Sequence, residues 1–502
     1  MQSALRFLAS GRNGLWAALA LFGALVACFW VGFIASDDTT YAVGAYGWID
    51  EFPYVGGHGT IRYPITIPMA LSFLTFGNNE FAFVLPSLLA LIAFLVVVWK
   101  VVRNRVGEIP AFAALIAVVT CPLIAIQASI ASVDIIEMAL LFGAFVLTLQ
   151  CIENGPSRNK LLLAGALCGI AFLTRETAVF VAVFYALLFL AGYGFVRWHY
   201  LWVAVGFLAV WAIEILYLTV MTGDPLYRFN IAMNHDSTID RTVDLAGNVI
   251  VNPIIDPLLV LFLNQEFMLL MFIAVPAAIW LCFGKSITAP VKRMARLMSL
   301  FAIVWFICVG AAQSLLPLNP RYFMITTTIA AILTGTAIGM LVCSAKARIR
   351  WAALLVLLGL VGTNFIAIYV ENKQPAFGEE ALIAALEAQD EPLVTDPMTH
   401  FRLRIPLRWA DGEERVSEDA PQPGDLYFYN PVRSETANAF MSEAQLPAYT
   451  PQESWQVVRT YEPDPSYLAL ALEATGVSAK LPGGLWQKLR YRHPPATLYR
   501  VQ

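Results

Sequence analysis

The hydrophobic positions of this chain gather in long runs separated by shorter polar stretches. A helix that spans a bilayer needs about 20 apolar residues, and eleven segments read as such helices. The pattern therefore predicts an α-helical polytopic membrane protein with about eleven transmembrane helices. The predicted spans are 14–35, 80–99, 110–128, 132–151, 160–174, 177–196, 200–222, 266–284, 297–316, 322–344 and 351–369.

Two further apolar segments, 64–77 and 254–263, are too short to cross a bilayer. Their length favours interfacial or re-entrant helices. They fall in the two longest predicted outer loops, 36–79 and 223–265. Loops longer than about 12–15 residues are usually functional or disordered. These two contain aromatic and apolar stretches, so we expect them to be ordered, with interfacial helices in the first.

The balance of charged residues changes near residue 370. Residues 1–370 contain 37 charged residues, whereas the 132 residues of 371–502 contain 31. The second part has the charge density of a water-soluble domain with its own core. Its candidate elements are a helix near 379–389 and strands near 392–395, 426–429 and 455–461. We predict a transmembrane domain, 1–370, followed by a small α/β or α+β domain, 371–502.

Basic residues set the predicted orientation of the spans. One set of loops carries fifteen Lys and Arg and the other carries five, and the richer set faces the cytoplasm. The N-terminus is then cytoplasmic, and an odd number of spans places 371–502 outside. Acidic residues gather on the outer side instead, which favours a chemical site there. Longer outer loops that simply hold more polar residues are the alternative.

Composition narrows the classes of protein further. The chain is 59% hydrophobic and 14% charged, against roughly 45–50% and 25% for soluble domains. This excludes a nucleic-acid binder and a disordered chain. The seven cysteines show neither a disulfide framework nor metal-binding spacing. No phosphate-binding loop is present, so a membrane lipid carrying a phosphate is the expected source of energy.

Two adjacent carboxylates, Asp37 and Asp38, follow the first predicted span. A carboxylate at a bilayer edge is costly, and partial burial raises its pKa so that it can act as a general base. Helix capping is the alternative. Asp134 begins the fourth span on the same side, and it is a third catalytic candidate. Its alternative is an ordinary helix-start charge beside a Ser132 cap.

Two arginines, each with a neighbour that can form hydrogen bonds, are candidates for binding a phosphate. Arg62 lies in the first outer loop with His58 nearby, and Arg321 and Tyr322 open the tenth span. Arginine binds phosphate through two parallel hydrogen bonds. An ordinary loop arginine paired with an acidic neighbour is the alternative for Arg62, and a snorkelling side chain is the alternative for Arg321.

The fourth outer loop contains a weaker candidate group, formed by His235, Asp236 and Arg241. We assign it as a substrate loop, although a solvated loop is the simpler interpretation. The spacing alone does not establish a metal site, so metal ligands stay unknown. A divalent cation is left open as a cofactor.

Taken in order, these residues resemble the glycosyltransferase C superfamily. The resemblance is to its polyprenyl-phosphate-sugar-dependent group, which includes bacterial aminoarabinose transferases and protein O-mannosyltransferases. The shared features span roughly residues 10–370. They are the Asp-Asp pair, the Tyr-Pro helix after it, the acidic start of the fourth span, the stretch GIAFLTRETA at 169–178 and the Arg-Tyr pair opening a late span.

The resemblance implies an extracytoplasmic active site and transfer with inversion. Asp37 would be the catalytic base and Asp38 its alternate or helper, while Asp134 would orient the acceptor or face a metal. Phosphate recognition would fall to Arg62 and to Arg321 with Tyr322. The donor would be a polyprenyl-phosphate sugar and the acceptor a lipid, glycan or protein hydroxyl. The protein would lie in a bacterial inner membrane among its lipids and contact no nucleic acid.

Two rival functions remain at this point. A lipid-linked-sugar flippase or other transporter needs ionisable residues at mid-depth in the spans, and Glu214 is almost the only candidate. A non-catalytic scaffold would use 371–502 for binding. Both rivals leave the acidic pair without a role.

Overall fold

The computed structural model describes residues 7, 11–234, 252, 255–312, 318–372, 376–434, 449–465, 467–490 and 493–502. Within these residues the chain forms two compact units. The first comprises the described residues of 1–32, 44–234 and 240–372. The second comprises those of 33–43 and 373–502. The segment that carries Asp37 and Asp38 thus belongs with the second unit.

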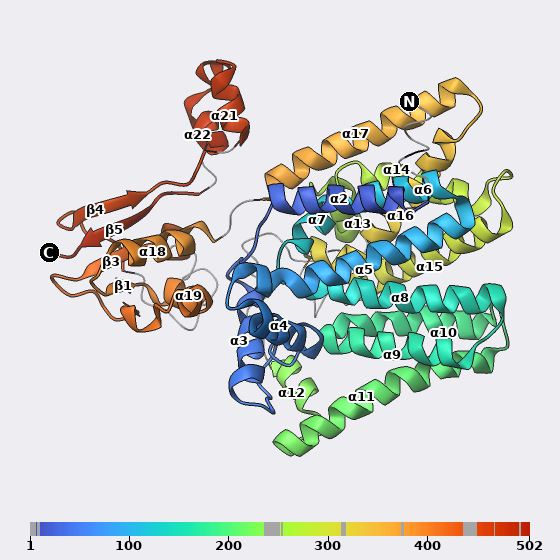
Figure 1. Ribbon diagram of the computed structural model, residues 1–502, viewed down its shortest axis with the longest axis horizontal. Helices are drawn as coiled ribbons and strands as arrows, with labels where there is room; N and C mark the ends of the chain where they lie inside the picture. Colours follow the sequence, from blue (N-terminus) through green and yellow to red (C-terminus); the bar gives the residue numbers. More distant parts are fainter. Residues whose placement is uncertain are drawn as a thin grey trace. The chain divides into compact units, whose positions relative to one another are not determined.

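The first unit is helical (Figure 1). Its α-helices are α2 (Asn13–Cys28), α4 (Tyr63–Phe76), α5 (Glu80–Val106), α6 (Glu108–Val119), α7 (Pro122–Ala128), α8 (Val133–Asn154), α9 (Arg158–Thr174), α10 (Val181–Ala191), α11 (Leu201–Thr222), α12 (Tyr227–Asn234), α13 (Ile255–Leu263), α14 (Leu270–Phe283), α15 (Ala289–Ala311), α16 (Met324–Val342) and α17 (Ala347–Glu371). Short 3₁₀ segments are η1 (Glu176–Phe180), η2 (Arg197–Tyr200) and η3 (Pro320–Phe323). Helix α3 (Asp37–Asp50) runs from the second unit into the first.

Apolar helices of spanning length are present, as the hydrophobic pattern predicts. Six helices in the described part of the chain are long and apolar enough to cross a membrane. A seventh span exists if α6 and α7 count as one, because these two helices are bent by 69° at a short break. The break, which the sequence pattern did not indicate, lies where Pro122 begins α7. Proline fixes its own backbone angle and lacks an N–H, so it starts helices readily.

Close helix contacts depend on glycine at two places. A Cβ on Gly165 of α9 would lie 2.0 Å from the carbonyl oxygen of Val203 in α11. A Cβ on Gly206 of α11 would lie 2.1 Å from the Leu162 carbonyl oxygen. Helices in membranes associate through such small residues, because the backbones can then approach closely. The close packing of α9 against α11 therefore requires glycine at these two positions.

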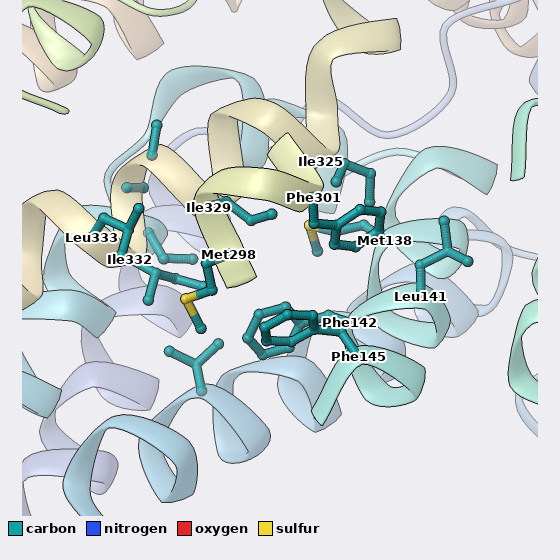
Figure 2. Close-up of a cluster of buried hydrophobic side chains, with 14 of the residues drawn as sticks. Met138, Leu141, Phe142, Phe145, Met298, Phe301, Ile325, Ile329, Ile332 and Leu333 are labelled. Atoms are coloured by element: carbon teal, nitrogen blue, oxygen red, sulfur yellow. The ribbon is translucent and has the colours of Figure 1, made fainter. Parts of the chain in front are cut away.

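An aromatic and aliphatic cluster joins α8, α15 and α16 (Figure 2). Phe145 stacks on Phe301 with 6.1 Å between ring centroids, and Phe142 meets Phe94 of α5 edge-on at 5.0 Å. Met298 and Ile329 are buried in the same cluster. Packed apolar side chains of this kind fix how the helices cross.

The segment 36–79, which the sequence predicts as the first outer loop, contains two helices. Asp37 and Asp38 lie in the first turn of α3, where negative charge is favoured. Helix α4 coincides with the short apolar segment noted in the sequence and exposes Ile67, Leu71 and Leu74 on its surface. A short helix with an exposed apolar stripe suits the membrane interface.

The second unit contains a mixed five-stranded sheet. Its strands are β1 (Leu393–Thr395), β2 (Val416–Ser417), β3 (Leu426–Tyr429), β4 (Gln456–Tyr461) and β5 (Ala496–Arg500), in the order β2-β1-β3-β5-β4. Strand β1 runs parallel to β2 and β3, while β5 is antiparallel to β3 and β4. Helices α18 (Phe377–Ala388) and α19 (Pro397–Trp409) contribute to its apolar core with Leu382, Leu403 and Leu407. The remaining helices are η4 (Glu413–Arg415), α21 (Tyr467–Ala474), η5 (Ser478–Lys480) and α22 (Gly483–Arg490).

Candidate active site

A buried ion pair joins two helix ends in the first unit. Asp134 lies in the first turn of α8, and Arg175 caps the end of α9. Their side chains form a salt bridge, and the two residues are only 3% and 5% exposed. Ser132 caps α8 by accepting a hydrogen bond from the Ile135 N–H at 3.4 Å. The cap expected from the sequence is present, and Asp134 additionally neutralises a buried arginine.

The aromatic ring of Tyr322 extends this pair. The Arg175 guanidinium lies 4.3 Å from the centre of that ring, within the range of a cation–π contact. Tyr322 is held in η3 because its carbonyl accepts a hydrogen bond from the Trp305 indole N–H at 2.8 Å. Neighbouring Arg321 lies 5.8 Å from the same ring. The structure therefore brings Asp134, Arg321 and Tyr322 together through Arg175.

Arg62 and His58 also lie together, just before α4. The Arg62 Nη2 atom is 3.3 Å from the His58 Nε2 atom and 4.0 Å from a carboxylate oxygen of Glu176. The preceding loop is held by α11 and α12. The Tyr217 hydroxyl donates to the Tyr54 carbonyl at 2.8 Å, and the Tyr227 hydroxyl donates to the Gly56 carbonyl at 3.2 Å.

Arg228 of α12, which is not among the candidates expected from the sequence, organises this second cluster. Its guanidinium donates to Glu176 at 2.8 Å, to Glu214 at 2.6 and 2.8 Å and to the Ile61 carbonyl at 2.8 Å. Arg228 and Glu214 are both buried. Glu214, the candidate transport residue, therefore has a buried cationic partner. Nothing in the local sequence pattern links these residues, since fourteen positions separate them.

A third buried carboxylate lies one helical turn after Asp134. Glu137 of α8 accepts a hydrogen bond from the Thr177 hydroxyl at 2.8 Å. Thr177 follows Glu176 in η1. The polar corner at Thr174–Thr177 thus supplies partners to α8 as well as to Arg62 and Arg228. In the sequence, the one available signal was the stretch GIAFLTRETA at 169–178, which contains this corner.

The two adjacent aspartates of the second unit differ sharply in environment. Asp37 is exposed, whereas Asp38 is 1% exposed. The Asp38 carboxylate accepts hydrogen bonds from the backbone N–H groups of Ile34 at 2.8 Å, Ser36 at 2.6 Å and Thr39 at 3.0 Å. Burial raises the pKa of Asp38 to about 6, against the lowering effect of these bonds and with a smaller contribution from Asp37. Asp38 therefore clamps the loop, and Asp37 is the accessible carboxylate.

The weaker candidates gain no structural support. His235, Asp236 and Arg241 lie outside the described residues. Within the residues that the structure describes, no group of three or more His, Cys, Asp or Glu side chains could hold a metal ion.

Comparison with known proteins finds one family model and several solved structures that this chain resembles. The model of the dolichyl-phosphate-mannose-protein mannosyltransferase family matches residues 65–217. The fold resembles ArnT from Cupriavidus metallidurans over almost the whole chain. A family-model match over residues 65–217 and an ArnT-like fold are what a likeness to the glycosyltransferase C superfamily predicts. This confirms the resemblance drawn from the sequence.

The structural matches share little sequence with this chain. Apo ArnT is 14% identical, with a TM-score of 0.53, over 96% of this chain and 97% of ArnT. ArnT bound to undecaprenyl phosphate is 13% identical, with a TM-score of 0.55, over 97% and 98%. The apo oligosaccharyltransferase of Archaeoglobus fulgidus is 12% identical, with a TM-score of 0.52, over 90% of this chain and 74% of that protein. A comparison with curated protein sequences finds no match.

The family model covers only part of the candidate residues. Asp134 and Arg175 lie within the matched segment, as do Glu176 and Glu214. Asp37, Asp38 and Arg62 precede it, and Arg321 follows it. The roles of individual residues therefore depend on the chemistry of the site rather than on the match.

Proposed function

We propose that this protein is an integral-membrane glycosyltransferase that takes a sugar from a polyprenyl phosphate. The family-model match over residues 65–217 and the apolar helices support the class of reaction. The donor class is supported by the ArnT structure described as bound to undecaprenyl phosphate. The acceptor is a hydroxyl of a lipid, glycan or protein on the outer face of a bacterial inner membrane. The proposed topology keeps eleven spans, a cytoplasmic N-terminus and an outer domain at 371–502.

The observation that carries the mechanism is the contrast between exposed Asp37 and clamped Asp38. Asp37 accepts the proton of the acceptor hydroxyl as its oxygen attacks the anomeric carbon of the sugar. The bond from that carbon to the phosphate oxygen breaks, and polyprenyl phosphate leaves with the electron pair. One displacement inverts the anomeric carbon and needs one base, which contributes roughly 10²–10⁴-fold. Asp134 orients the acceptor or supports the site through its pair with Arg175.

Cationic side chains stabilise the phosphate as its charge increases. Arg62 is the first candidate, because its side chain is partly exposed. The Glu176 carboxylate, 4.0 Å away, is shared with Arg228. His58 lies beside it. Arg321 with Tyr322 is the second candidate. Arg175 and Arg228 are buried among carboxylates, so they hold the cluster together.

An apolar groove offers a place for the lipid chain of the donor. The cavity of about 320 Å³ is lined by side chains of α10, α11 and the nearby face of α9, including Ala186, Tyr185 and Ala204. Val179 of η1 also lines it, three residues after Glu176. A hydrocarbon chain buried there would gain the free energy of apolar contact.

The test is sugar transfer by single Asp-to-Asn variants in membranes supplied with polyprenyl-phosphate sugar. Asp37→Asn should lose at least about 100-fold in kcat. Asp50→Asn is a matched control, because Asp50 is exposed at the far end of the same helix. Full activity of Asp37→Asn would remove the proposed base. A flippase is favoured instead if the wild type transfers no sugar and Asp37→Asn membranes still translocate labelled lipid.

The acceptor and sugar require a cellular readout. A deletion strain should lose one sugar modification from its envelope lipids or glycans, measured as a mass difference by mass spectrometry. Wild-type protein should restore that mass, and Asp37→Asn should not. An unchanged envelope mass profile would count against the proposed class of acceptors.

A further inference from the structure

Helix α19 of the second unit begins on a buried polar cluster. Asp396 follows strand β1 and caps the helix, accepting from the Thr399 N–H at 2.9 Å and the Thr399 hydroxyl at 2.7 Å. The Ser434 hydroxyl donates to the same carboxylate at 2.8 Å. All three residues are buried. The start of α19 is therefore fixed to the sheet, and the helix has a defined direction.

That helix contacts the acidic loop within the same compact unit. Arg402, in the second turn of α19, donates a hydrogen bond from Nη1 to the carbonyl oxygen of Ala35. Trp409, the last residue of the helix, meets Phe33 edge-on with 5.9 Å between ring centroids. These two contacts, one from Arg402 and one from Trp409, hold the 33–36 loop against α19.

The contacted loop is in an unusual conformation. Ala35 has a φ of 54°, in the left-handed region that residues with a side chain seldom adopt. Such a conformation costs of order 1–3 kcal/mol and persists only where the surroundings enforce it. Ile34 and Ser36, on either side of Ala35, donate the N–H groups that clamp Asp38. Arg402 therefore binds the carbonyl of Ala35, the residue that lies between two of the three donors that clamp Asp38.

Charge connects the same residues. Burial lowers the pKa of Arg402, as does neighbouring Arg433, while Asp38, Glu379 and Asp37 raise it. Glu379 is itself paired with Arg433 at 2.6 Å. Arg402 is thus the cation of this helix that faces the aspartate pair.

We propose that Arg402 is a positioning residue for the aspartate pair, which it holds in place through Ala35 and to which it presents an opposite charge. The C-terminal domain is then part of the catalytic apparatus. This role rests on the proposed function, in which Asp37 is the base. It goes beyond that function because it assigns a task to a residue far outside the matched family segment.

The experiment compares Arg402→Met, Arg402→Lys and Arg404→Met in the purified full-length protein. Arg404 is a matched control, because it lies on the same helix with its guanidinium 4.6 Å from the Phe401 ring. Release of sugar from undecaprenyl-phosphate-linked mannose or aminoarabinose is measured from pH 5 to 9, with water as the acceptor. The infrared carboxyl band is also titrated in the wild type and in Asp38→Asn. The difference between their spectra reports on the aspartate pair without requiring turnover.

Arg402→Met should lower kcat at least about tenfold with little change in KM. Because a nearby opposite charge lowers the pKa of a carboxyl group by about 1–3 units, both the acid limb of the pH profile and the infrared midpoint should rise by about one pH unit. Arg402→Lys should restore both midpoints, and Arg404→Met should match the wild type. Identical midpoints in Arg402→Met and Arg404→Met would overturn the proposal. Wild-type protein that releases no sugar would defeat the proposed function, while the infrared midpoints would still decide the role of Arg402.

Discussion

At the scale of single residues, the two neighbouring aspartates show why sequence position alone does not assign a role. Asp37 and Asp38 have the same chemistry and adjacent places, yet one is exposed and the other is held by three backbone donors. The sequence predicted a functional carboxylate here. Only the backbone path of 33–36, which brings its N–H groups to Asp38, distinguishes the clamp from the accessible base.

The raised pKa of Asp38 predicts how stability changes with pH. The folded value of about 6 exceeds the ordinary 3.8, so the folded state favours the protonated acid. Its contribution is fully present below pH 3.8 and is lost as the pH rises through about 6. Two pKa units correspond to about 3 kcal/mol. Between pH 4.5 and pH 7.5, the Tm of the wild type should therefore fall further than the Tm of Asp38→Asn, as measured by thermal unfolding. Parallel curves for the two proteins would contradict the assignment.

The Asp134–Arg175 pair predicts a large effect on stability as well as activity. Asp134→Asn leaves the Arg175 charge buried without its partner, and such a loss costs about 3–5 kcal/mol. The thermal midpoint in detergent should fall clearly, measured by size-exclusion chromatography after heating. The double variant Asp134→Asn, Arg175→Met should recover part of this loss, since it removes both charges. A double variant less stable than Asp134→Asn would argue against the pair.

At the scale of elements, six helices of spanning length among the described residues lie at predicted spans, whereas α2 ends at Cys28 although its predicted span continues to residue 35. Strand β3 and helix α4 lie where the sequence placed them. The bend between α6 and α7 escaped prediction, because the apolar run continues through it. The Arg228–Glu214 contact escaped as well, since α11 and α12 meet through a turn whose path the sequence does not specify.

The groove along α10 and α11 predicts a dependence on lipid length. Ala186→Trp should fill part of the cavity and raise KM about tenfold for an undecaprenyl donor, which corresponds to about 1.4 kcal/mol of lost binding. A donor with a short prenyl chain should be affected much less. Ala209→Trp is the control, because Ala209 is exposed on α11 and does not line the groove. Equal KM changes for long and short donors would place the chain elsewhere.

At the scale of the whole molecule, composition and charge predict the membrane class, and the apolar helices and the family-model match over residues 65–217 agree with it. The sequence could not predict that residues 33–43 would cluster with 373–502, because this depends on contacts between segments more than 300 positions apart. The proposed topology likewise depends on the bias of fifteen against five basic loop residues.

Reporter fusions test that topology directly. Alkaline phosphatase fused after Gln502 should be active, since it folds only outside the cytoplasm, whereas fusion after Lys346 should be inactive. Green fluorescent protein at the same two positions should give the opposite pattern. An active phosphatase after Lys346 would reverse the orientation and move 371–502 inside.

The corner between α9 and η1 has a consequence for how this chain can vary. Arg175 and Glu176 are neighbours, yet one pairs with Asp134 and the other with Arg62 and Arg228. Inserting or deleting one residue here would carry both side chains out of reach of their partners at once. Among homologues, the length of this corner should therefore tolerate fewer insertions than the turns at the opposite ends of the same helices.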